Sequence, residues 1–258
     1  MKDEKIAYKI SLFNIHLNNI KQDDLLRQLT DGIFITPNVD HIIKLQKDRL
    51  FYDIYQNVDW IVCDSKIVQL GLTFLGKPVK EVIPGSSFFS AYYQHHKDND
   101  QIRIFLLGAA EGIARKAQEE INKKVGRNMV VASHSPSFGF ENDEQECEEI
   151  LSLINTSDAT VLVVGVGAPK QEKWIYKYKD RLSNIKLFMA LGATIDFEAG
   201  TLKRAPVWMQ KMSLEWAYRL FKEPKRLWKR YMIDDLPFLG LILKEKLKIY
   251  RNPFEEKK

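Results

Sequence analysis

The stretch VLVVGVGAPKQE at residues 161–172 joins an apolar run to two glycines and a proline, and then to a polar, helix-forming segment. Such a run predicts a buried parallel strand that ends in a glycine-rich turn before a helix. A turn of this kind leaves backbone N–H groups and a helix N-terminus free to hold an anion such as phosphate. The spacing is not that of the dinucleotide fingerprint, because Lys170 stands where a third glycine would be needed. A tight connection without a ligand is the alternative.

Five further apolar runs repeat the strand pattern, and amphipathic segments separate them. The runs are IFIT (33–36), WIVC (60–63), IFLLG (104–108), MVVAS (129–133) and LFMALG (187–192). Strands that alternate with helices predict an α/β fold with an open, mostly parallel, doubly wound sheet of the Rossmann-like kind. Helices are expected at 39–56, 86–96, 110–124, 143–155 and 169–181, with an edge hairpin at 5–17 and a helix at 21–31 before the first strand.

Length and composition are those of a globular protein. With 258 residues, 45% of them hydrophobic, the chain forms one large domain or one domain with an appendage. Cys63 and Cys147 lie in an apolar strand and an acidic helix, which predicts neither a disulfide nor a zinc site and indicates a reducing cytoplasm. We expect no signal peptide and no spanning helix, because the apolar run at 236–243 is far shorter than the roughly 18 residues needed.

The C-terminal part of the chain is strongly basic. Residues 202–258 hold 15 Lys or Arg and 7 Asp or Glu, a balance of +8, so the +5 of the whole chain leaves −3 for residues 1–201. Aromatic residues interleave with these cations, a pattern suited to the surface of an anionic bilayer. A helical hairpin packed on the main domain and a nucleic-acid surface are the alternatives. We place the boundary near 200, which gives an α/β domain at 1–200 and a basic, aromatic, helical appendage at 201–258.

Polar residues follow several of the predicted strands at the point where each strand ends. The carboxyl ends of parallel strands meet at one edge of a sheet, where ligands bind. Asp64 comes directly after WIVC, and a carboxylate there can act as a general base towards a substrate hydroxyl. Thr36 and Asn38 flank Pro37 after the first strand. For all three positions the alternative is a turn or a cap of the following helix.

The sequence offers little that would hold a metal ion. The pair Asp98 and Asp100 has the D-x-D spacing, but it precedes the strand IFLLG and therefore lies at the amino end of the sheet. We expect a solvated loop there. The five histidines show no metal-ligand spacing.

Taken together, these motifs are specific. TPNVD (36–40), Asp64, GVGAPKQE (165–172), the DFEAG...RAP segment and the tail LEWAYRLFKEPKRLWKRY resemble, in order and spacing, the WecG/TagA/CpsF family of bacterial glycosyltransferases over about residues 10–232. The resemblance implies an inverting transferase that moves an N-acetylhexosamine of the ManNAc type, or its uronate, from a UDP-sugar to a sugar on a polyprenyl pyrophosphate, in the synthesis of cell-envelope polysaccharide or teichoic acid. It also implies work at the cytoplasmic face of the membrane, as a peripheral protein, with no metal, no cofactor and no nucleic-acid partner. Whether the chain forms a homo-oligomer stays open.

The resemblance also implies roles for individual residues. Asp64 matches the family's proposed base, Thr36 and Asn38 match positions that line the substrate pocket, and Gln171 matches the polar group that holds the sugar nucleotide. The other implied substrate-binding residues are Lys170, Gly167, Gly192, Arg204, Arg219, Arg226 and Arg230. The arginines could close over the site and neutralise the diphosphate. Ser65 and Ala193 depart from the pattern, because glycine is usual at both places.

Two other functions remain open from the residues alone. A nucleotide-dependent oxidoreductase on the same sheet would need a complete G-x-G-x-x-G and an acidic residue that closes the following strand, and both are missing. A non-enzymatic module that binds a membrane or nucleic acid through its tail would explain the charge of +8 but not the polar clusters at the strand ends.

Overall fold

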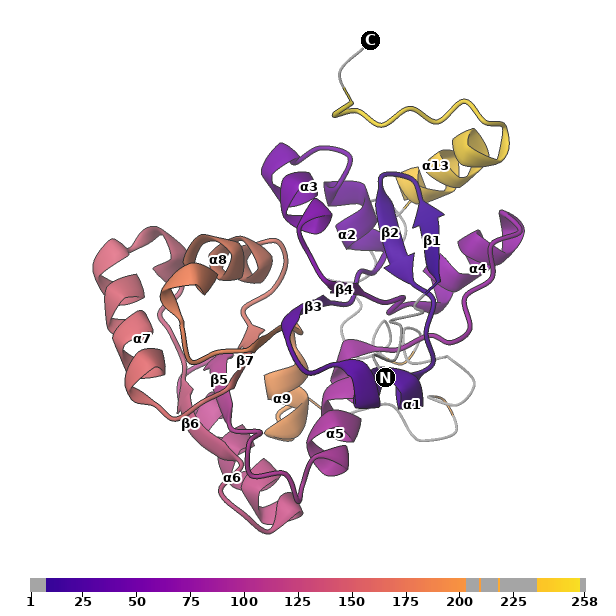
Figure 1. The fold of residues 1–258 in the computed structure, drawn as a ribbon. Helices are drawn as coiled ribbons and strands as arrows, with labels where there is room; N and C mark the ends of the chain where they lie inside the picture. The colour runs from indigo at the N-terminus through magenta and orange to yellow at the C-terminus, as the bar shows by residue number, and fades with distance from the viewer. Residues whose placement is uncertain (1–7, 203–208, 210–217, 219–235, 256–258) are drawn as a thin grey trace.

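A six-stranded parallel sheet forms the centre of the computed structural model, which describes residues 8–202, 209, 218 and 236–255 (Figure 1). The strands are β3 (Gly32–Ile35), β4 (Trp60–Ile61), β5 (Ile104–Gly108), β6 (Val130–His134), β7 (Val161–Gly165) and β8 (Leu187–Ala190), in the order β4-β3-β8-β7-β5-β6. Each strand falls on one of the six apolar runs, and every pairing in this sheet is parallel. The predicted α/β fold is therefore confirmed.

Helices cover both faces of the sheet, because each strand buries side chains on both sides. On β7, Leu162 and Val164 point into one core, and Val161 and Val163 point into the other. The first core also takes side chains from α2 (Val39–Lys44), α3 (Arg49–Gln56), α4 (Lys66–Phe74), α7 (Glu144–Thr156) and α8 (Lys170–Tyr178). The second takes them from α1 (Gln22–Gln28), α5 (Gly85–His95), α6 (Ile113–Val125) and α9 (Thr194–Glu198). Two short 3₁₀ turns, Phe140–Asn142 and Lys179–Arg181, complete the loops.

Three local expectations need correction. The N-terminal hairpin, β1 (Lys9–Leu12) and β2 (Ile15–Asn18), forms its own two-stranded sheet instead of extending the main one. The Asn18 side chain accepts the N–H of Ile61 at 2.7 Å, so a side chain occupies a donor of β4 that a further strand would use. The helix expected at 39–56 is split into α2 and α3, because extended Asp48 accepts the N–H of Phe51 and caps a new helix. The helix α4 forms in a segment for which the sequence predicted a helix only through the capping alternative at Asp64.

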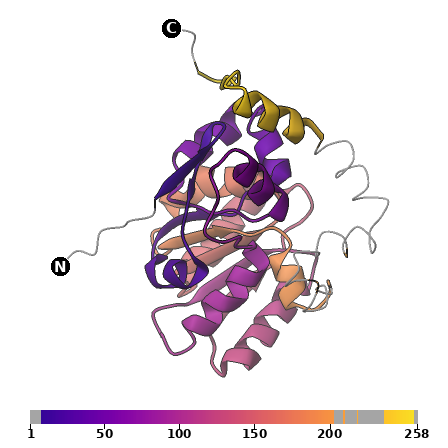
Figure 2. The same ribbon diagram turned by 90° about the vertical axis from the view of Figure 1, so that its right-hand side faces the viewer.

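The C-terminal helix α13 (Leu236–Lys246) packs on the main domain (Figures 1 and 2). Phe238 and Ile242 are buried, and Gly71 of α4 makes room for them, since a Cβ there would lie 2.8 Å from Ile242 Cδ1. The Lys77–Glu245 ion pair at 3.0 Å adds a polar link. Within the described residues no helix is long and apolar enough to cross a membrane. The domain boundary near 200 stays a prediction.

The topology produces a crevice at the carboxyl edge of the sheet. The chain leaves β5 through α6 towards β6, and it leaves β7 through α8 towards β8, in the opposite direction along the sheet. Since crossovers are right-handed, α6 and α8 lie on opposite faces, as the two cores show. The neighbours β5 and β7 therefore form a topological switch point, where ligands of open α/β sheets bind.

Candidate active site

Glycines let the ends of three strands approach one another closely. A Cβ on Gly165, the last residue of β7, would lie 2.6 Å from the carbonyl oxygen of Gly192, which follows β8. A Cβ on Gly108, the last residue of β5, would lie 2.5 Å from the carbonyl oxygen of Gly165. These contacts exclude any side chain, so the floor of the crevice is bare backbone.

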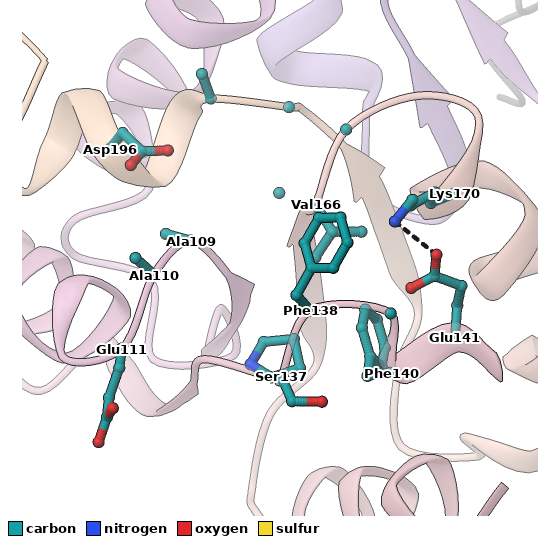
Figure 3. Close-up of a pocket in the computed structure, with 16 residues that line it drawn as sticks. Ala109, Ala110, Glu111, Ser137, Phe138, Phe140, Glu141, Val166, Lys170 and Asp196 are labelled. Carbon is teal, nitrogen blue, oxygen red and sulfur yellow. Dashed lines mark ion pairs between the residues drawn. The ribbon is translucent and has the colours of Figure 1, made fainter. Parts of the chain in front are cut away.

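A cavity of about 590 Å³ opens above this floor (Figure 3). Its walls come from residues 109–111 after β5, 136–141 after β6, 165–167 with Lys170 after β7, and 192–193 with Asp196 after β8. The structure thus places Gly167, Lys170 and Gly192, three of the predicted substrate-binding residues, in one cavity lining. The size is that of an ordinary small-molecule site.

The buried side chain of Gln171 joins two glycine turns, one at Gly167 after β7 and the other at Gly192 after β8. Only 2% of this residue is exposed, and its Oε1 accepts the N–H of Gly167 at 3.1 Å and the N–H of Gly192 at 3.0 Å. Its Nε2 donates to Glu172 Oε1 at 2.8 Å, which fixes the orientation of the amide. The N–H of Gly167, which the sequence suggested for an anion, is therefore used inside the protein, and so is the N–H of Gly192 after β8. Gln171 itself is absent from the cavity lining.

Glu172 lies in a buried polar cluster under the same turn. It is 1% exposed, and burial raises its pKa to about 7, although the hydrogen bond from Gln171 and the charge of Lys44 act to lower it. Lys44 donates to Asp40 Oδ2 at 2.7 Å and to the carbonyl oxygen of Ala168 at 3.0 Å. The lysine thereby joins the segment after β3 to the turn after β7, two parts of the crevice edge.

Asp64 and Thr36 meet at the beginning of α5. The N–H of Gly85 donates to Asp64 Oδ1 at 2.9 Å, and Thr36 Oγ1 is 2.8 Å from the position that a Cβ on Gly85 would occupy. Leu191, after β8, has its Cδ2 atom 2.9 Å from the same Cβ position of Gly85. The structure therefore brings the ends of β3, β4 and β8 together, but Thr36, Asn38 and Asp64 are absent from the lining of the cavity at β5 and β7. Gly85 was not predicted from the sequence, although the PGSS stretch at 84–87 marks a helix start.

Asp64 and Asn38 could each have been a helix cap, and the structure shows that only Asn38 is one. Ser65, not Asp64, caps α4, since its Oγ accepts the N–H of Val68 at 3.2 Å. This gives Ser65 a reason to stand where the family usually has glycine. Asn38 does cap a helix, because its Oδ1 accepts the N–H of His41 at the start of α2.

The remaining predicted positions are outside the site as the structure describes it. Arg204, Arg219, Arg226 and Arg230 lie outside the described residues. Asp98 and Asp100 lie in the exposed loop before β5, at the amino end of the sheet. In the described part of the chain, no three His, Cys, Asp or Glu side chains are grouped to hold a metal ion.

The fold and the site together define a class of protein. An open parallel sheet with a ligand-sized cavity at its switch point is the arrangement of nucleotide-dependent α/β enzymes, and Asp64 follows β4 at the same edge of the sheet, with β3 and β8 between β4 and β7. The chain belongs to the glycosyl transferase WecG/TagA/CpsF family, which it matches over residues 10–252. The resemblance seen in the motifs is confirmed, and it extends beyond residue 232.

Proteins of Staphylococcus aureus are among the relatives that the chain resembles. The chain is 28% identical over 224 residues to the N-acetylglucosaminyldiphosphoundecaprenol N-acetyl-beta-D-mannosaminyltransferase of strain MRSA252, covering 86% of this chain and 84% of the relative. The protein of the same name from strain MW2 is 27% identical with the same coverage. The chain is therefore a glycosyltransferase, and it is neither an oxidoreductase nor a non-enzymatic module.

Proposed function

We propose that this glycosyltransferase moves an N-acetylhexosamine of the ManNAc type from a UDP-sugar to a sugar on a polyprenyl pyrophosphate, with inversion, in the synthesis of a cell-envelope polymer. The names of the relatives support both the donated sugar and a lipid-diphosphate acceptor. The single observation that carries the proposal is the placement of Asp64 and Thr36 on the same sheet edge as the cavity at the β5–β7 switch point.

The cavity is the proposed donor site. The bare backbone at Gly165 and Gly192 allows a ligand to approach the strand ends closely, and the volume suits a nucleoside diphosphate. The donated sugar would then lie towards β8 and β3, where Leu191, Thr36 and Gly85 meet. Asn38 is proposed to contribute from the cap of α2.

Asp64 is the proposed general base. As the acceptor hydroxyl attacks the anomeric carbon, its proton passes to the carboxylate, a new C–O bond forms, and the bond to UDP breaks on the opposite face. The hydrogen bond from Gly85 engages Asp64 Oδ1 and orients the group. Gln171 is proposed to act on the donor through the two glycine turns that it fixes.

The departing diphosphate needs positive charge, which we assign to the arginine tail motif. Lys170 is a weak candidate, because its ammonium is already paired with Glu141 at 2.6 Å. Arg204, Arg219, Arg226 and Arg230 would supply the charge, as a clamp over the cavity. The same basic appendage would hold the protein on the inner face of the membrane, where a polyprenyl-linked acceptor lies.

The test is Asp64→Asn, assayed by UDP release with a panel of UDP-sugars and a short-chain lipid pyrophosphate acceptor. We expect turnover to fall roughly a hundredfold or more while UDP affinity stays unchanged, because one proton-transfer group is lost. Asp53→Asn, at an exposed carboxylate paired with Arg49 on α3, is the control. Retained turnover in Asp64→Asn would remove this residue from the mechanism.

Donor binding is tested separately by thermal unfolding. A ligand at a hundred times its dissociation constant adds about 2.7 kcal/mol to stability, which is readily seen. Stabilisation by UDP, but not by NAD or duplex DNA, is the expected result. Equal stabilisation by NAD would contradict the assignment of the cavity to a UDP-sugar.

A further inference from the structure

A lysine bridge joins the two parts of the crevice edge to which the donor and the base are assigned. Lys44, the last residue of α2, donates to the carbonyl oxygen of Ala168 at 3.0 Å. Ala168 directly follows the turn 165–167, which lines the cavity. The same ammonium donates to Asp40 Oδ2 at 2.7 Å, one helical turn earlier in α2. The ammonium therefore has a partner on each side and reaches from α2 to the end of the cavity turn.

The segment that carries Lys44 is also attached to Asp64. The carbonyl oxygen of Pro37 accepts the N–H of Asp64 at 3.3 Å, and Asn38, the next residue, caps α2. On its side chain, Asp64 accepts the N–H of Gly85 at 2.9 Å. Residues 37–44 therefore form one short connection between the backbone of Asp64 and the turn after β7.

A second lysine makes a similar bridge at a place that does not involve the cavity turn. Lys173 of α8 pairs with Asp48, the cap of α3, at 2.5 Å. The side chains of Lys44 and Lys173 are equally exposed, at 34% each. The two lysines thus join neighbouring elements by the same chemistry, and they differ in whether the bridge ends at the turn that lines the cavity.

We infer that Lys44 is a positioning residue for the transfer reaction, because its ammonium fixes the turn that lines the donor cavity against the segment that holds Asp64. This role rests on the proposed function, which assigns the donor to the cavity and the base to Asp64. The described lining of the cavity does not include Asp64, so the distance between base and donor is set by the protein between them. A misplacement of about 1 Å can cost on the order of a hundredfold in rate.

Lys44→Met removes the ammonium and keeps an unbranched side chain. Turnover at saturating donor and acceptor should fall roughly ten- to a hundredfold, while the KM for the UDP-sugar and the calorimetric affinity for UDP stay within about threefold of wild type. Lys44→Arg keeps the charge and the N–H donors and should recover most of the turnover. Rates are expressed per UDP-binding site, from the calorimetric stoichiometry, so that a misfolded fraction does not imitate the effect.

Lys173→Met is the matched control, and its turnover should stay within about threefold of wild type, since a partly exposed ion pair contributes little. Equal losses of turnover in Lys44→Met and Lys173→Met would overturn the positioning role. A loss of UDP affinity in Lys44→Met with unchanged turnover would overturn it as well, because the lysine would then serve donor binding alone.

A double-mutant cycle with Asp64→Asn tests whether Lys44 acts through the base. Once the carboxylate is replaced, no base remains to be placed, so Lys44→Met should cost little further turnover in the Asp64→Asn background. Losses that multiply in full would overturn the positioning role. Full turnover in Lys44→Met beside an inactive Asp64→Asn would contradict only the role of Lys44, whereas a wild-type protein that transfers no sugar would contradict the proposed function itself.

The buried carboxyl of Glu172 offers a different explanation that a further variant can reject. Burial raises the pKa of Glu172 and the charge of Lys44 acts to lower it, so a counter-ion role for Lys44 has to be separated from positioning. Glu172→Gln removes the charge that would need a counter-ion. Turnover should stay low when Glu172→Gln is added to Lys44→Met. Recovery of turnover in that double variant would overturn the positioning role.

Discussion

The buried carboxyl of Glu172 should make the stability of the protein depend on pH. Its pKa is about 7 in the folded state and has an ordinary value of 4.5. The folded state therefore binds more protons than the unfolded state above pH 4.5, so stability falls as the pH rises towards 7 and then levels off. The shift corresponds to roughly 3 kcal/mol of stability lost at pH 8.

The perturbation that reveals this effect is Glu172→Gln. Glutamine has the same shape and can still accept the hydrogen bond from Gln171, but it has no charge to desolvate. The free energy of unfolding is measured by urea titration at pH 5 and pH 8. The value for the variant minus the value for wild type should be roughly 2 to 3 kcal/mol larger at pH 8 than at pH 5. Glu149→Gln, at an exposed position of α7, controls for removal of a glutamate.

A difference between Glu172→Gln and wild type that is the same at pH 5 and pH 8 would refute this reasoning. It would mean that Glu172 is ionised when buried, with Lys44 as its effective counter-ion. A variant that becomes less stable relative to wild type as the pH rises would show the opposite sign, and it would refute the reasoning as well.

Two further outcomes are expected. Gly165→Ala should cost about 1–3 kcal/mol of stability and abolish stabilisation by UDP, because its Cβ would meet a backbone oxygen at 2.6 Å. Urea titration measures the loss of stability, and thermal shift measures the response to UDP. The control is Gly240→Ala, which has open space around it and should bind UDP normally. Replacing Arg219, Arg226 and Arg230 together by glutamine should release the protein from anionic vesicles and abolish transfer, as sedimentation in low and high salt and the UDP-release assay would show. Normal transfer by that variant would contradict the clamp.

The strands were predictable because each is a short apolar run between polar segments, and a chain of this size buries such runs in its core. The helices were harder. The split at Asp48 depends on one side chain that turns to cap a helix within an otherwise continuous apolar pattern. The segment 66–74 is apolar on several sides and contains Gly71, whose purpose is visible only once α13 lies against it.

The ends of the strands predict part of the site. They point to Thr36, Asp64 and the turn after β7, and these do lie on one edge of the sheet. The end of β6 gives no such signal because SPSFGFE contains no recognisable motif, although Phe138 and Glu141 follow that strand. The role of Gln171 could not be read from the sequence, because one of its partners, Gly192, is 21 residues away along the chain.

The negative charge of the cavity lining indicates that the site needs additional positive charge to bind a diphosphate. Among the described residues, its lining holds three carboxylates, Glu111, Glu141 and Asp196, against one ammonium, Lys170, so it carries a net charge of −2. A diphosphate that gains negative charge as its sugar leaves would be repelled by such a lining. Residues 202–258 carry a balance of +8 and can supply the compensating cations. Binding of UDP should therefore weaken steeply with added salt, while binding of uridine should not, and equal salt dependence for the two ligands would contradict a cationic arm over the diphosphate.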